Sequence, residues 1–212
     1  ERHAGAVIFG GPMSANDPDD YIRAEIAWIG VTLQEHKPFL GICLGAQMLA
    51  NHLGAAVGLH PARHVEIGYH RVAVTPDAQA ICNWPERFYQ WHREGFQVPG
   101  TATLLATAEG PFANQAFSYD GCAVALQFHP EITYAQVHRW TNNNAQRLRL
   151  PGALPRDEHI RGHFAHAPRV HRWMDDFLAN WLHCKVGPRS PAGGTSDADR
   201  GAAADDSVNV PG

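Results

Sequence analysis

Long hydrophobic runs are missing from this sequence. No stretch approaches the roughly 18 consecutive apolar residues that a membrane-spanning helix needs, and no charged segment followed by an apolar one opens the chain. The sequence therefore indicates neither a membrane anchor nor an export signal. We expect a cytoplasmic protein without a membrane partner.

Positive charge is also sparse. The 212 residues contain 17 lysines and arginines against 21 aspartates and glutamates, which gives a formal net charge of −4. Nucleic-acid binding needs a stripe or patch of basic residues, and here they are scattered. A nucleic-acid partner is therefore not expected.

Cysteine is scarce and forms no C-x-x-C pair: the four are Cys43, Cys82, Cys122 and Cys184. Neither a disulfide framework nor a zinc site is indicated, and we interpret the last three as structural or free thiols. The histidines within residues 159–171 repeat no metal-ligand spacing. We expect no metal and no cofactor.

Strand and helix patterns alternate at the two ends of the chain. Residues 6–9 and 38–42 are short apolar runs typical of buried strands, and residues 46–53 form a helical segment. Short strand-like pieces dominate residues 65–125. The pattern predicts an α/β sheet covered by helices, with one packed domain over residues 1–185.

Two further helices are expected ahead of the last one. Residues 18–35 form an amphipathic helix, with Asp17 placed to cap it and Pro18 at its first position. Residues 134–149 are helical, and Pro151 then begins a histidine-rich connector.

The last helix carries an apolar stripe that we expect to dock on the sheet. The stripe consists of Val170, Trp173, Met174, Phe177, Leu178, Trp181 and Leu182. Residues 186–212 are rich in glycine, proline, alanine and serine without an aromatic residue, and we expect a disordered tail.

The sharpest local motif is G-x-C-x-G at residues 41–45. Glycines on both sides allow Cys43 to sit strained and exposed between a strand and a helix, as the nucleophilic serine does in a G-x-S-x-G elbow. The helix N-terminus favours a thiolate, and the backbone N–H of Leu44 points to where an oxyanion would develop. A buried structural cysteine is the alternative interpretation.

Two further segments support a catalytic interpretation. The apolar strand at residues 123–128 leads into His129 and Glu131, whose i and i+2 spacing puts both side chains on one side. A base and its orienting carboxylate need this proximity. The loop at residues 10–12, Gly-Gly-Pro, follows another strand, so its N–H groups can approach a substrate oxygen at the same sheet edge.

Four motifs in this order resemble the class I, triad-type glutamine amidotransferases. They are Gly-Gly-Pro at 10–12, G-I-C-L-G-A-Q at 41–47, Trp91-His92, and L-Q-F-H-P-E at 126–131. The run W-H-R-E-G-F at 91–96 resembles the stand-alone, GMP-synthase-like branch of that family.

The resemblance implies a flavodoxin-like, mostly parallel sheet with helices on both faces. It also implies that the chain lacks the N-terminal strands of its relatives. Cys43 would form a γ-glutamyl thioester with glutamine, with His129 as acid and base and Glu131 as its orienter. Gly11 and Leu44 would supply the oxyanion hole.

The resemblance implies further that Gln47, His92 and Glu94 bind the substrate, although relatives often carry aspartate where Glu94 stands. The expected small-molecule partner is L-glutamine or another γ-glutamyl compound. Because the sequence has no ATP-binding motif, the ammonia acceptor would belong to a separate synthetase chain.

Three alternatives stay open at this point. The protein could hydrolyse a γ-glutamyl compound other than glutamine. It could be a binding or regulatory protein that keeps the pocket without turnover. It could also be a DJ-1-like protein that handles aldehydes or oxidants.

Overall fold

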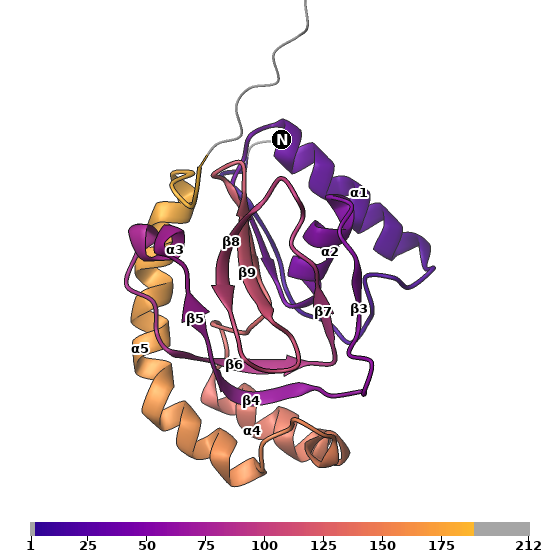
Figure 1. Cartoon of the computed structure of the whole chain (residues 1–212), viewed down its shortest axis with the longest axis vertical. Helices are drawn as coiled ribbons and strands as arrows, with labels where there is room; N and C mark the ends of the chain where they lie inside the picture. Colours follow the sequence, from indigo (N-terminus) through magenta and orange to yellow (C-terminus); the bar gives the residue numbers. More distant parts are fainter. Residues whose placement is uncertain (1–2, 189–212) are drawn as a thin grey trace, which may run out of the picture.

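The computed structural model describes residues 3–188, which fold as alternating strands and helices (Figure 1). In chain order the elements are β1 (Ala6–Ile8), α1 (Asp20–Gln34), β2 (Phe39–Ile42), α2 (Leu44–His52), β3 (Val57–Leu59), β4 (Glu66–Arg71), β5 (Ala73–Val74), α3 (Pro76–Ile81), β6 (Arg87–His92), β7 (Glu94–Phe96), β8 (Thr103–Thr107), β9 (Asn114–Tyr119), β10 (Ala123–Leu126), α4 (Tyr134–Asn143), the 3-10 helix η1 (Ala145–Arg149) and α5 (Arg156–Leu182).

The central sheet has six strands in the order β1-β2-β10-β9-β8-β5. β2 pairs in parallel with both β1 and β10, whereas β9, β8 and β5 continue the sheet by antiparallel pairing. The remaining strands form two short antiparallel ribbons, β3-β7 and β4-β6. The carboxyl ends of the three parallel strands therefore meet at one edge, where ligands collect in open α/β sheets.

Helices cover both faces of this sheet. In β2, Leu40 faces a core that includes Trp173 and Phe177 of α5. Phe39 faces the opposite core together with Ile29 of α1. This alternation follows from the two-residue period of a strand, and it confirms the α/β class with helices on both faces.

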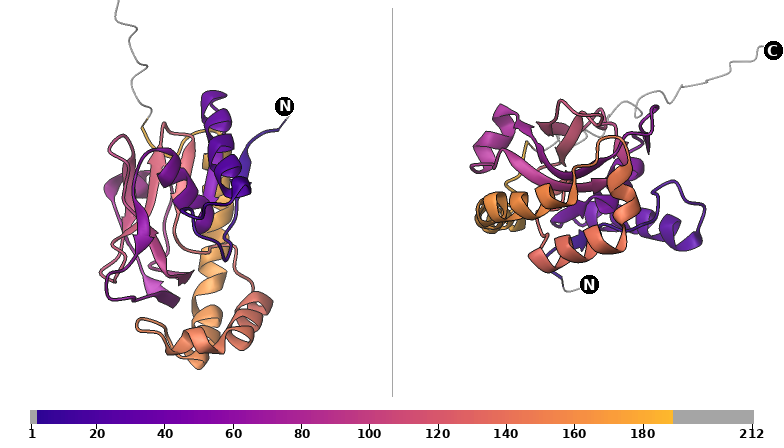
Figure 2. Two further views of the ribbon diagram at one scale, coloured as in Figure 1. Left: turned by 90° about the vertical axis from the view of Figure 1, so that its right-hand side faces the viewer. Right: turned by 90° about the horizontal axis from the view of Figure 1, so that it is seen from below.

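α4 and the first turns of α5 lie together at one end of the molecule (Figures 1 and 2). The expected connector after Pro151 is wrong, because α5 already begins at Arg156. Asp157 and Glu158 occupy its first turn, where the helix dipole favours acidic residues. His159 and His163 are buried on its inner face and hydrogen-bond to tyrosines of the β4-β6 ribbon.

Two helix boundaries also differ from expectation. α1 begins at Asp20 with Asp19 as its N-cap, so Pro18 does not occupy the first helical position. The carboxylate of Asp17 instead accepts a hydrogen bond from the Ser14 N–H at 2.8 Å within the preceding loop. The helix expected over 134–149 divides into α4 and η1, with Asn144 between them.

A disulfide joins Cys122 to Cys184 across 62 residues. The interpretation of these two as free or unpaired structural thiols is therefore wrong, whereas Cys43 and Cys82 are free. The pair forms because α5 returns its C-terminus to the turn between β9 and β10. Local spacing carries no sign of such a long-range contact.

The apolar stripe of α5 packs as expected through Val170, Trp173, Phe177 and Trp181, although Leu182 is exposed. Packing continues beyond residue 185, because Val186 is fully buried and its N–H donates to the carbonyl of Gly121. Of the tail expected over residues 186–212, residues 189–212 lie outside the described residues. Among residues 3–188, none of the helices combines the length and apolar character needed to cross a membrane.

Candidate active site

Cys43 lies at the turn between β2 and α2 in a strained backbone conformation. Its φ of 52° and ψ of −103° are unusual for a residue with a side chain. A β-carbon on Gly41 would lie 2.4 Å from the carbonyl oxygen of Gly45, and one on Gly45 would lie 2.1 Å from that of Ile8. Both glycines of the motif are thus required by close backbone approach.

His129 and Glu131 follow β10, the neighbour of β2. Nδ1 of His129 lies 2.8 Å from Oε1 of Glu131, and the His129 side chain is almost completely buried. The His129 N–H donates to the carbonyl of Tyr89 at 2.8 Å, and the Trp140 ring meets the imidazole edge to face. The imidazole is therefore fixed in position from several sides.

The surroundings of His129 favour its charged form. Burial lowers the pKa of His129, but the charge and hydrogen bond of Cys43 and those of Glu131 outweigh it and raise the pKa to about 10. Cys43 and His129 therefore lie in direct electrostatic contact. Cys43 thus lies where an imidazolium and a helix N-terminus both present positive charge.

Cys82, the other free cysteine, has a different environment. Burial raises the pKa of its thiol to about 11. It packs at the border of the core formed by α5 and the sheet, and it lines neither of the cavities beside Cys43. Cys82 can therefore serve as the unactivated thiol with which Cys43 is compared in the same protein.

A cavity of about 510 Å³ opens beside the three residues. A β-carbon on Gly10 would lie 2.7 Å from Cε1 of His129, so the Gly-Gly-Pro loop reaches the site only because residue 10 has no side chain. The sequence did not predict the aromatic wall or the polar residues of α4 and η1. The lining residues are Phe9, Gly10, Gly11, Pro12, Cys43, Trp91, His129, Glu131, Gln136, Trp140, Asn144 and Arg147.

The two backbone positions expected as an oxyanion hole flank Cys43. Leu44 is the first residue of α2, where backbone N–H groups lack partners within the helix. Gly11 lies against the Leu44 side chain, and a β-carbon on Gly11 would be 3.1 Å from Leu44 Cδ2. Gly11 thus lies close to Leu44, and it lines both cavities beside Cys43.

Gln47, His92 and Glu94, which were expected to bind substrate, are linked through the backbone carbonyl oxygen of Glu94. The carbonyl oxygen of Glu94 accepts a hydrogen bond from Gln47 Nε2 at 2.8 Å, and His92 Nδ1 lies 2.9 Å from it. Gln47 and His92 are buried. Their contacts show that they hold the Glu94 backbone, which borders a small second cavity beside Cys43.

A buried carboxylate that the sequence did not indicate supports His92. Oε2 of Glu66 lies 3.1 Å from Nε2 of His92 and accepts a hydrogen bond from Gln115 at 2.9 Å. Burial raises the pKa of Glu66, but the hydrogen bonds of His92 and Gln115 outweigh it and hold it below its ordinary value. No sequence spacing indicated this contact, because it joins residues on different strands.

The histidines of α5 serve as hydrogen-bonding partners. His159 Nδ1 lies 2.9 Å from the Tyr89 hydroxyl, and His163 Nδ1 lies 3.2 Å from the Tyr69 hydroxyl. Burial lowers the pKa of His159 and His163. In the part of the chain that the structure describes, no group of three histidine, cysteine or acidic side chains could hold a metal ion.

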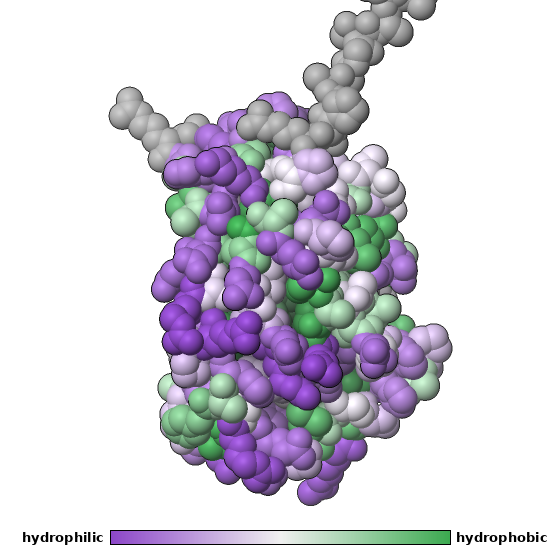
Figure 3. Space-filling view, turned by 60° about the vertical axis from the view of Figure 1, so that its left-hand side comes forward, coloured by the Kyte–Doolittle hydropathy of each residue, from purple (hydrophilic) through white to green (hydrophobic). Residues whose placement is uncertain are grey.

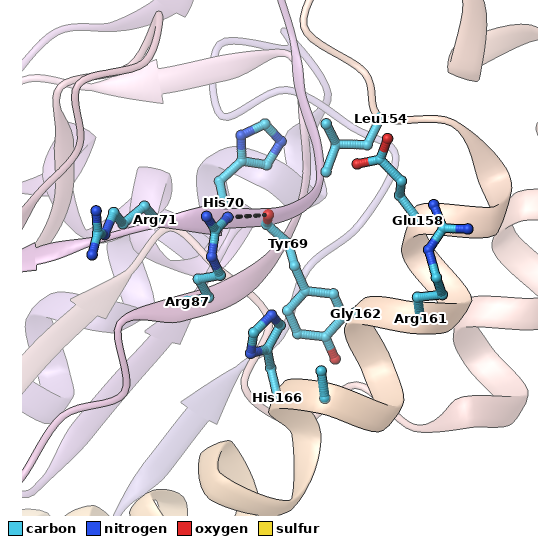
Figure 4. Close-up of a pocket in the computed structure, with 10 residues that line it drawn as sticks. Tyr69, His70, Arg71, Arg87, Leu154, Glu158, Arg161, Gly162 and His166 are labelled. Carbon is cyan, nitrogen blue, oxygen red and sulfur yellow. Dashed lines mark hydrogen bonds between the residues drawn. The ribbon is translucent and has the colours of Figure 1, made fainter.

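A separate cavity of about 410 Å³, which shares no residue with those beside Cys43, lies between the β4-β6 ribbon and α5. Hydrophilic residues cover much of the face in Figure 3, with hydrophobic residues between them in small groups. In Figure 4, Arg87 from the ribbon lies across from Arg161 and His166 of α5. Arg87 donates to the carbonyl of Tyr69, and Arg161 pairs with Asp157, so the arginines already have protein partners.

Fold and site together define an α/β protein with a cysteine at a strand-to-helix turn and a histidine-carboxylate pair beside it. The model of the class-I glutamine amidotransferase family matches residues 1–146. The chain belongs to that family. This membership removes the DJ-1-like alternative.

Curated relatives agree with the family. A GMP synthase (glutamine-hydrolyzing) of Thermomicrobium roseum is 34% identical over 137 residues, which cover 63% of this chain and 24% of the relative. One of the subunits of a glutamine-hydrolyzing GMP synthase of Thermoplasma volcanium is 31% identical over 139 residues, covering 64% and 66%. The matched region thus spans about a quarter of the first relative and just under two thirds of the second.

Solved structures show the same fold. A glutamine amidotransferase of Methylobacillus flagellatus superposes with a TM-score of 0.79 at 28% identity, covering 89% of this chain and 78% of that one. One from Thermotoga maritima gives a TM-score of 0.73 at 31% identity, covering 83% and 77%. The flavodoxin-like arrangement expected from the motifs is confirmed.

Proposed function

We propose that this protein hydrolyses the side-chain amide of glutamine through a thioester on Cys43, with His129 as acid and base and Glu131 as its orienter. The observation that carries the proposal is the contact among these three side chains at the carboxyl edge of the parallel strands. Family membership supports the amide-hydrolysing activity.

The reaction has two halves. The Cys43 thiolate attacks the amide carbon, and the N–H groups of Gly11 and Leu44 stabilise the oxyanion. The His129 imidazolium protonates the leaving nitrogen, the C–N bond breaks and ammonia departs. Water then attacks the thioester while His129 takes its proton, and the C–S bond breaks to give glutamate and the restored thiolate.

The ammonia acceptor in this proposal lies on a separate synthetase chain. Relatives described as single subunits of GMP synthase support a separate partner. A cytoplasmic location is part of the proposal, because free glutamine and ammonia-consuming synthesis are expected together there. Co-purification with a synthetase chain from the source organism tests this partnership.

A γ-glutamyl compound larger than glutamine is the second candidate substrate. The cavity beside Cys43 measures about 510 Å³ and has Trp91 and Trp140 in its wall, more room and apolar surface than a leaving ammonia needs. Comparing glutamine with γ-glutamyl amides of aromatic amines separates the two candidates. The alternative of a binding or regulatory protein without turnover is disfavoured by the intact contact of Cys43, His129 and Glu131.

The deciding experiment follows glutamate release from L-glutamine, with and without a synthetase partner. Wild-type protein should release glutamate, and Cys43→Ala should abolish the release. Cys82→Ala is the matched control and should retain the wild-type rate. No release from folded wild-type protein under either condition, or release that survives Cys43→Ala, would refute the thioester mechanism.

A further inference from the structure

Arg147 borders both cavities that open beside Cys43. It lines the large cavity with Trp140 and the small one with Glu94. It is also the first residue beyond the region that the family model matches, which ends at residue 146. The family match therefore gives this arginine no role.

The backbone around Arg147 is held at both ends. Its N–H donates to the carbonyl of Asn144 at 2.9 Å. Farther along, the Val65 N–H donates to the Pro151 carbonyl at 2.9 Å, and Gly152 adopts a φ of +94° with its α-carbon packed against Val65. The segment that carries Arg147 is thus fastened to the start of the β4-β6 ribbon.

The guanidinium of Arg147 has no carboxylate partner within residues 3–188. Ion pairs found there join other arginines to acidic side chains, as Arg161 joins Asp157. Glu131, the acidic residue that lines the large cavity, already pairs with His129, with 2.8 Å between Oε1 and Nδ1. A half-buried arginine in a cavity wall beside a nucleophile is therefore available for an anionic group of a ligand.

Glu94 supplies the opposite charge. Its backbone is fixed by Gln47 and His92, and the residue lines the small cavity together with Arg147 and Cys43. A γ-glutamyl compound carries an α-carboxylate and an α-ammonium at the end remote from the scissile amide. Arg147 and Glu94 match these two groups, whereas Arg93, which also lines the small cavity, is exposed.

We propose that Arg147 is a specificity-determining residue that binds the α-carboxylate of a γ-glutamyl substrate whose α-ammonium lies towards Glu94, the residue that the family resemblance already assigns to substrate binding. The ligand class is a γ-glutamyl amide with a free amino-acid end. Such a site rejects N-acylated and α-esterified compounds as well as internal glutamines of proteins. The catalytic meaning of this site rests on the proposed function, but its binding specificity can be measured without turnover.

The test measures binding to the full chain carrying Cys43→Ala by calorimetry. The ligands are L-glutamine and 4-aminobutanamide, which has the amide and the amine without the α-carboxylate. Arg147→Met should weaken L-glutamine binding by about 10- to 100-fold, the usual effect of losing a hydrogen bond to a charged group. The same substitution should leave 4-aminobutanamide binding within about twofold of its parent, since no carboxylate contact is lost.

Arg149→Met is the matched control, because Arg149 lies on the same 3-10 helix and is exposed. It should leave both affinities unchanged, and Arg147→Lys should restore part of the L-glutamine affinity. Equal effects of Arg147→Met on both ligands, or none on L-glutamine, would overturn the proposal, as would failure of the Cys43→Ala protein to bind L-glutamine. Arg147-dependent binding without glutamate release by wild type would sustain this proposal while refuting the proposed function.

Discussion

Gly10 lies so close to His129 that a β-carbon on it would be 2.7 Å from Cε1 of the imidazole. The same β-carbon would be 3.3 Å from Cβ of Cys43. The loop after β1 therefore fixes the space in which thiol and imidazole face each other. Contact between these segments, far apart in sequence, makes the Gly-Gly-Pro loop part of the site.

Gly10→Ala should lower glutamate release by at least about 100-fold, because a displacement of the imidazole by an ångström costs that much in a positioned reaction. The measurement is kcat/KM for glutamine. Gly100→Ala is the control, since a β-carbon there meets nothing within 4 Å. A Gly10→Ala protein of wild-type activity would contradict the described geometry.

The charged state of His129 predicts a pH dependence of stability. Its folded pKa of about 10 lies above the ordinary value of 6.5, so the stabilisation is complete below about pH 6.5 and is lost as pH rises towards 10. Removing the carboxylate by Glu131→Gln should move the His129 titration to lower pH. NMR titration of His129 in wild type and variant checks the direction, and an unmoved titration would contradict the role of Glu131.

Glu94→Gln should weaken binding of L-glutamine to the Cys43→Ala protein by about tenfold or more, because the α-ammonium loses a charged partner. Binding of 4-carbamoylbutanoate, which lacks the α-amino group, should stay unchanged. Glu109→Gln serves as the control, since Glu109 is exposed and lines neither cavity beside Cys43. Equal losses for the two ligands would assign Glu94 a purely structural role.

The Cys122–Cys184 bond should stabilise the fold by about 2–4 kcal/mol, because it closes a long loop. Thermal unfolding of wild type under oxidising conditions should therefore occur at a higher temperature than that of Cys122→Ser. Reductant should lower the wild-type unfolding temperature to that of the variant. Cys82→Ser should keep the full response to reductant.

Features that depend on neighbouring residues could be predicted from the sequence, whereas features that depend on contacts between remote segments could not. The turn at Cys43 and the contact of His129 with Glu131 depend on local sequence, so the motif and the spacing predicted both. The expected exposure of Cys43 is wrong, because its side chain is buried in the core beside the sheet. The support of His92 by Glu66, the disulfide and the position of Arg147 depend on contacts between remote segments. Spacing along the chain carries no signal for these.

The start of α5 was missed for a related reason. Its first half is rich in histidine and arginine and contains Pro168, a composition typical of a loop. Burial of His159 and His163 against tyrosines of the β4-β6 ribbon explains why the segment is helical. Only the apolar second half displayed its helical period in the sequence.

Covalent labelling by 6-diazo-5-oxo-L-norleucine, an electrophilic analogue of glutamine, followed by peptide mass spectrometry, tests whether Cys43 is the nucleophile. We expect one label, on Cys43, that excess L-glutamine prevents and that Cys43→Ala abolishes. Cys82 should stay unlabelled, because burial raises the pKa of its thiol to about 11. Folded protein that takes up no label, or takes it up on Cys82 in place of Cys43, would show that Cys43 is not the nucleophile of a glutamine site.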